Sequence, residues 1–207
     1  MSRSAIAVVG SPIVDSTAGL AATLAVAAAR NDQLSCLLVE MVSEESAHRS
    51  PTLLASAEAR AIESRLRHAG LEAASRGHIC STSLTDERWE EAGPLALIEH
   101  AMPSRVVFSF GADIPYRRIS ELGADIAGCV ALLDLPAERS LGALVAAEML
   151  ARGIAVKVTG RQPGLVAARR ALAGVVPGGA AEQYAERVVS QLVGRGSRVA
   201  QRFQETG

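Results

Sequence analysis

AIAVVGSPIVDST, residues 5–17, is the stretch that decides the fold. Its first five residues are apolar and β-prone and end at Gly10, which predicts a buried strand over Ala5–Val9 followed by a tight loop. An Ala- and Leu-rich segment of good helix formers, Thr17–Arg30, comes directly after the loop. The expected order is therefore a strand, a glycine-containing loop and a buried helix.

The rest of the chain alternates in the same way between short apolar runs and helix-forming segments. Further strands are predicted at 36–39, around Ile79, and at 105–110, 130–135 and 154–159, and helices at 51–68, 89–100, 117–122, 141–152, 165–172 and 180–193. Buried strands that alternate with helices favour a three-layer αβα fold with a mostly parallel, doubly wound sheet. Such a sheet places its functional site at the carboxyl ends of its strands.

Composition limits the classes of function. We assign residues 1–193 to a single α/β domain and 194–207 to a C-terminal tail. The net charge of −1 offers no general field to attract nucleic acid, and none is expected as a partner. Cys36, Cys80 and Cys129 are far apart and lie in apolar runs, which favours buried reduced thiols and a cytoplasmic chain.

The loop between Gly10 and Thr17 occupies the place of a phosphate-binding P-loop, whose pattern is G-x-x-x-x-G-K-[ST]. Gly10 and Thr17 match this pattern, but Asp15 and Ser16 stand where the second glycine and the lysine belong. The only lysine of the chain is Lys157, inside a predicted strand. We therefore expect no standard ATP site, and the simpler role of Asp15 or Ser16 is to N-cap the following helix.

This layout resembles the MinD/ParA family of deviant Walker ATPases, which includes the TadZ/CpaE-type proteins of pilus assembly and localisation. The resemblance covers most of the chain through its order of strands and helices. The family's two loop lysines would fall at Ser11 and Ser16, its Walker B aspartate at Ser109 or Phe110, and its adenine-reading asparagine near Gly160. The resemblance thus implies a P-loop NTPase-like fold in which nucleotide binding is lost or greatly weakened.

Other candidate residues lie near predicted strand ends. Glu40 and Asp113 are the best carboxylates for a strand-end site, and Arg117, Arg118 and Arg161 are candidates for a surface that holds a partner or an anion. Capping of loops and exposure to solvent are the alternative roles. The histidines share no helical face at a metal-binding spacing, so we expect no metal, no cofactor and no catalytic residue.

Together these features predict a non-enzymatic scaffold or localisation protein that acts through protein contacts in a pilus, secretion or cell-division system, with a homodimer across the loop face as one form of contact. Two alternatives stay open: a Rossmann-like enzyme or binder of another anion, and a RecA-like regulator of the cell-division-inhibitor type. In the tail, Arg195, Arg198 and Arg202 surround Val199 and Phe203. We expect a frayed terminus there, with weak membrane attachment as the alternative.

Overall fold

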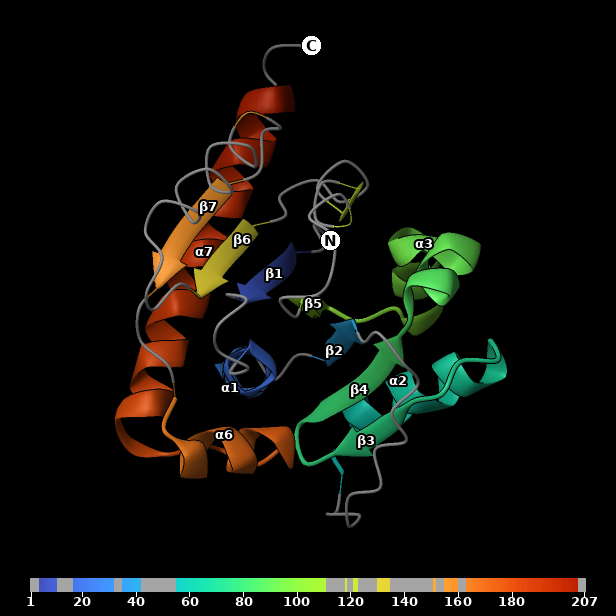
Figure 1. Ribbon diagram of the computed structural model, residues 1–207, viewed down its shortest axis with the longest axis horizontal. Helices are drawn as coiled ribbons and strands as arrows, with labels where there is room; N and C mark the ends of the chain where they lie inside the picture. The colour runs from blue at the N-terminus through green and yellow to red at the C-terminus, as the bar shows by residue number, and fades with distance from the viewer. Residues whose placement is uncertain are drawn as a thin grey trace.

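A seven-stranded sheet with helices on both faces forms the core of the chain (Figure 1). The computed structural model describes residues 4–10, 17–31, 35–41, 55–110, 118, 121–122, 130–134, 151, 155–159 and 163–204. The strands are β1 (Ser4–Gly10), β2 (Cys36–Met41), β3 (Ala74–Arg76), β4 (Ile79–Leu84), β5 (Arg105–Phe110), β6 (Val130–Asp134) and β7 (Ala155–Thr159). The helices are α1 (Thr17–Asn31), α2 (Ala57–His68), α3 (Asp86–Ala101), α6 (Leu165–Leu172) and α7 (Gly179–Gln204).

The strands lie in the order β3-β4-β2-β5-β1-β6-β7. Each pair of neighbours is parallel except β3 and β4, which form an antiparallel edge. The side chains of β2 and all but the first of β5 are buried, as expected for parallel strands that are covered on both faces. The predicted mostly parallel α/β sheet is therefore confirmed.

The sheet separates two hydrophobic cores. On one face, which we call the α1 face, α1 packs with parts of α6 and α7 through small aliphatic side chains. A Cβ atom at Gly19 would lie 2.7 Å from the Cβ atom of Ala168, so glycine is what lets α6 lie directly against α1. The other face, the α3 face, is covered by α2 and α3 and contains Trp89, Phe108 and Phe110.

Helix caps set boundaries that differ from those predicted from the sequence. The helix predicted from residue 51 begins at Ala57, because the hydroxyl of Ser56 accepts a hydrogen bond from the Ala59 amide at 3.2 Å. Residues 51–54 lie outside the described part of the chain. Likewise α3 begins three residues earlier than predicted, because Thr85 caps it through the Arg88 amide at 3.3 Å.

Two further segments refine the predicted helices. The predicted break near Pro94 is present as a kink, where Gly93 has φ 69° and ψ 156°. The last helix continues to Gln204, so that 194–204 is helical in line with α7. The predicted helix over 141–152 lies outside the described residues except for Ala151.

The single strand expected around Ile79 is a hairpin of β3 and β4 that docks on the end of α6. Its turn residue Gly77 and the glycine after α6, Gly174, touch through their backbones: a Cβ atom on Gly77 would lie 2.0 Å from the Gly174 carbonyl oxygen. The His78 amide donates to the same carbonyl at 3.1 Å. In the described part of the chain, none of the helices has the length and apolar character needed to cross a membrane.

Candidate functional site

The carboxyl ends of β1 and β5 meet where the chain leaves the sheet in two directions. After β1 the chain enters α1 on the α1 face, whereas after β5 it reaches Leu122, which packs on the α3 face. Neighbouring strands whose connections leave toward opposite faces form a topological switch point, at which α/β sheets bind their ligands. We take this edge as the candidate site.

Gly10 and Thr17, two of the predicted loop residues, lie against each other at this edge. Gly10 ends β1 and Thr17 begins α1. A Cβ atom at position 10 would lie 1.9 Å from Oγ1 of Thr17 and 3.2 Å from its Cβ, so this approach of strand and helix requires glycine. Asp15 and Ser16 fall outside the described residues, and their capping of α1 stays a prediction.

Glu40, the predicted strand-end carboxylate, belongs to a polar row across three strands. It is in register with Ser83 of β4 and with Ser109 of β5. Both Glu40 and Ser109 are buried, and residues in register on parallel strands point to the same face of the sheet, here the α1 face. The row brings two hydroxyls beside one carboxylate. Asp113, the other predicted carboxylate, lies outside the described residues.

The backbone of Lys157 lies in β7 at the far side of the sheet. Lys157 is in register with Leu132 of β6, which is itself in register with Val8 of β1. Since neighbouring strands are about 4.8 Å apart, the backbone at Lys157 is roughly 10 Å from that of β1. The one lysine of the sequence thus belongs to a distant strand and not to the loop that precedes α1.

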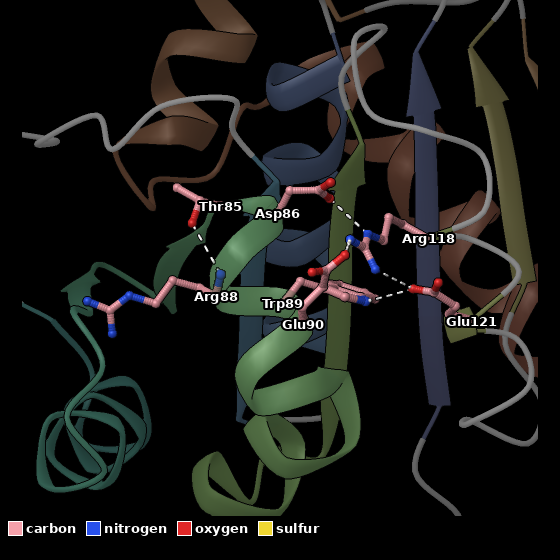
Figure 2. A network of polar contacts seen from close by, with 7 residues as sticks. All are labelled: Thr85, Asp86, Arg88, Trp89, Glu90, Arg118 and Glu121. Atoms are coloured by element: carbon pink, nitrogen blue, oxygen red, sulfur yellow. Dashed lines mark hydrogen bonds and ion pairs between the residues drawn. The ribbon is translucent and has the colours of Figure 1, made fainter.

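Arg118 lies buried against the first turns of α3, where three carboxylates surround it (Figure 2). Its guanidinium donates to Oδ1 of Asp86 at 2.8 Å, to Oε1 of Glu90 at 2.6 Å and to Oε2 of Glu121 at 2.9 Å. We call these four residues the Arg118 cluster. The hydrogen bond to Asp86 is the largest cause that raises the pKa of Arg118, while burial acts in the opposite direction. The guanidinium therefore stays charged.

The carboxylates of the Arg118 cluster are much more exposed than its guanidinium. The side chain of Arg118 is only 4% exposed, whereas those of Asp86, Glu90 and Glu121 are 45%, 60% and 42% exposed. The guanidinium is thus enclosed by the carboxylates that accept its hydrogen bonds. Arg117 and Arg161, predicted together with Arg118, fall outside the described residues.

Trp89 connects this cluster with the core of the α3 face. Its ring packs edge-on against Phe108 and Phe110, with centroids 5.9 Å away in both cases. Its Nε1 donates at 3.1 Å to Oε2 of Glu121, the same oxygen that accepts from Arg118. The cluster thus ties the chain that follows β5 to the beginning of α3.

The carboxylates of this cluster were not predicted from the sequence. Asp86 and Glu90 are spaced i, i+4 and Arg118 and Glu121 are spaced i, i+3, so each pair shares a helical face, and this spacing is the signal that could have indicated them. Spacing alone does not show that the two pairs meet, because 32 residues separate Arg118 from Asp86.

The strand order bears on the kind of α/β protein. In the dinucleotide-binding and flavodoxin-like orders, the first and second strands are neighbours. Here β5 lies between β1 and β2. The sheet therefore differs from both of those arrangements.

Comparison with known proteins adds no family: neither a protein-family model nor a curated protein matches the chain. Within the ranges that the structure describes, no three side chains of His, Cys, Asp or Glu form a group that could hold a metal ion. The mostly parallel α/β sheet is the level of classification that these findings support.

Proposed function

We propose that the chain is a non-catalytic scaffold or localisation protein with a MinD/ParA-like, P-loop-derived domain that acts through protein contacts. The observation that carries this proposal is the corner of Gly10 and Thr17 at the switch point, together with the location of the only lysine in β7. A P-loop needs its lysine in the loop to neutralise the outer phosphates. Without that charge, nucleotide binding is lost or greatly weakened.

Electrostatics at the same edge supports the proposal. The Arg118 cluster adds exposed carboxylates, and the buried row beside β1 contributes Glu40. A site that binds ATP concentrates positive charge and helix dipoles around the phosphates. At this edge the guanidinium of Arg118 is already engaged by three carboxylates, which supports a loss of phosphate binding.

The proposed partners are proteins of a pilus, secretion or cell-division system in the cytoplasm, with a homodimer across the loop face as one form of contact. The alternative of a Rossmann-like enzyme is less well supported, because β1 and β2 are not neighbours. A RecA-like regulator without nucleotide would share the scaffold's lack of catalysis. It would differ in its partner.

Calorimetry with MgATP, MgADP, MgGTP and NAD tests the loss of nucleotide binding. We expect no heat of binding and no thermal shift for the native chain. Magnesium-dependent binding at micromolar concentration would overturn the proposal, and binding of NAD alone would favour the Rossmann-like alternative.

A gain-of-function variant tests the P-loop origin. Asp15→Gly combined with Ser16→Lys turns residues 10–17 into the complete pattern G-x-x-x-x-G-K-T. We expect this double variant to bind MgATP measurably. The control Asp15→Gly with Ser16→Ala, which lacks the lysine, should not bind MgATP. A folded double variant that binds no nucleotide would count against a P-loop-derived domain.

A further inference from the structure

Exposed apolar side chains gather on two helices. Among the described residues, the large hydrophobic side chains that stay exposed are Leu95 and Met102, at 45% and 59%, and Leu165 and Val166, at 67% and 74%. The first two lie on α3 and directly after it, and the other two begin α6. Apolar side chains that are grouped on an otherwise polar surface indicate a contact surface.

The charged residues beside these two pairs have opposite signs. On α3, the exposed Glu99 lies between Leu95 and Met102 at the spacing i, i+4, i+7, which places the three on one side of the helix. On α6, exposed arginines follow Leu165 and Val166 at i+4. We define the acidic patch as Leu95, Glu99 and Met102, and the arginine patch as Leu165, Val166, Arg169 and Arg170.

Met102 stands out within the acidic patch because of its backbone. It ends α3 in the left-handed region, with φ 47° and ψ 43°, where glycine is the favoured residue. It is the one residue other than glycine with positive φ among those described. Its side chain packs little within the chain, so neither the backbone nor the core explains a methionine here.

The two patches cannot meet within one copy of the chain. The acidic patch belongs to α3, whose buried residues Leu97 and Ile98 pack on the α3 face, whereas α6 packs through Ala171 on the α1 face. Figure 1 shows α6 beside α1 and α3 on the other side of the sheet. Complementary patches on opposite sides of a protein join separate copies head to tail, which builds a ring or a filament.

We propose that the acidic patch of one copy docks on the arginine patch of a second copy. Burial of four apolar side chains supplies attraction, and the Glu and Arg side chains around them set the orientation. Two short helices form a contact at the small end of specific interfaces, so we expect association at high protein concentration only. The contact gives the proposed scaffold a means of assembly, and it does not depend on whether the loop binds a nucleotide.

Sedimentation velocity over a concentration series tests this contact with charge-reversal variants of the full chain. Arg169→Glu with Arg170→Glu makes both patches acidic, and Glu99→Arg makes both basic. We expect each variant alone to associate at least about tenfold more weakly than the native chain, because like charges then face each other. An equimolar mixture of the two should regain association, since each acidic patch again meets a basic one.

A matched control variant separates this contact from a general effect of net charge. Arg60→Glu with Arg187→Glu changes the net charge by the same amount as Arg169→Glu with Arg170→Glu, at exposed positions on α2 and α7, and should associate like the native chain. Far-UV circular dichroism confirms that each variant is folded. A native chain that stays monomeric at every concentration overturns the proposal. So does a Glu99→Arg variant that associates normally, or a mixture that fails to associate. These outcomes are independent of the result of the nucleotide-binding experiment, so a failure of either proposal can be told from a failure of the other.

Discussion

The hydrophobic cores on the two faces of the sheet are packed with different kinds of side chain. On the α1 face, alanines of α1 and the bare backbone at Gly19 let helices approach closely. On the α3 face, the large rings of Trp89, Phe108 and Phe110 fill the space, and the Arg118 cluster closes it toward solvent. Stability on the first face therefore depends on keeping side chains small, and on the second on keeping one ring and one guanidinium in place.

Removal of the central ring should have the largest effect. We expect Trp89→Ala to lower the free energy of unfolding by about 3–5 kcal/mol, because it leaves a cavity beside two Phe rings. Trp89→Phe should lower the free energy of unfolding clearly less, because it keeps a ring in the core. The remaining cost comes from the smaller ring and the lost hydrogen bond to Glu121. Urea unfolding followed by far-UV circular dichroism measures both, because Trp89 is the only tryptophan. An equal cost for both variants would contradict the importance of the ring.

Removal of the guanidinium should come next. Arg118→Met removes the guanidinium whose hydrogen bonds these three carboxylates accept, and breaking a buried ion pair costs about 3–5 kcal/mol. Because these carboxylates are 42–60% exposed and can turn toward water, we expect a smaller loss, about 2 kcal/mol. Arg118→Lys keeps the charge without the fork of donors and should lie between native and Met. Equal stability of native and Met variants in urea would show that the cluster does not hold the fold.

The two described cysteines, one on each face, predict a loss of stability at alkaline pH. Burial is the main cause that raises the pKa of Cys36 and of Cys80 from 9.0 to about 12. The unfolded thiols lose their protons first, so the stabilisation is complete below pH 9 and is lost as the pH rises toward 12, at about 1.4 kcal/mol per thiol per pH unit.

Urea titrations at pH 8 and pH 10 measure this loss of stability. The variant Cys36→Ala with Cys80→Ala should show a flatter pH dependence than the native chain. An unchanged pH dependence would mean that neither thiol contributes.

The smallest effect concerns the α1 face. A methyl group at Gly19 would lie 2.7 Å from the Cβ atom of Ala168, which costs about 1–3 kcal/mol, while alanine is better in a helix by about 1 kcal/mol. We expect Gly19→Ala to lower stability by about 1 kcal/mol net. Adding Ala168→Gly should recover the packing part of that loss, measured as the coupling in a double-mutant cycle. No coupling would show that α6 moves away freely.

Much of the fold was predictable because its signals are local. Apolar runs that end in glycine indicated β1 and β5, and the helix formers after Thr17 indicated α1. The strand near Ile79 was weaker because its alternating serine and threonine residues resemble a loop as much as a strand. Its role became visible only through its pairing with β2 and its docking on Gly174.

The candidate site was predictable only in part. Gly10, Thr17 and Glu40 were expected at the carboxyl edge from their places after or within apolar runs, and the structure puts all three there. The Arg118 cluster was not expected. The i, i+4 spacing of Asp86 and Glu90 and the i, i+3 spacing of Arg118 and Glu121 indicate shared helical faces, but the same spacing also occurs on solvated helix faces.

By itself the sequence determined the alternation of buried strands and helices and the missing lysine of the loop, because both depend on neighbours within a few residues. Only the tertiary structure decided that β5 lies between β1 and β2, that Glu40 lies beside Ser109, and that the acidic and arginine patches face away from each other. These relations join residues far apart in the chain. They follow from which strands pair and which face each helix covers. Both depend on burying the whole sheet and are not determined by any one segment.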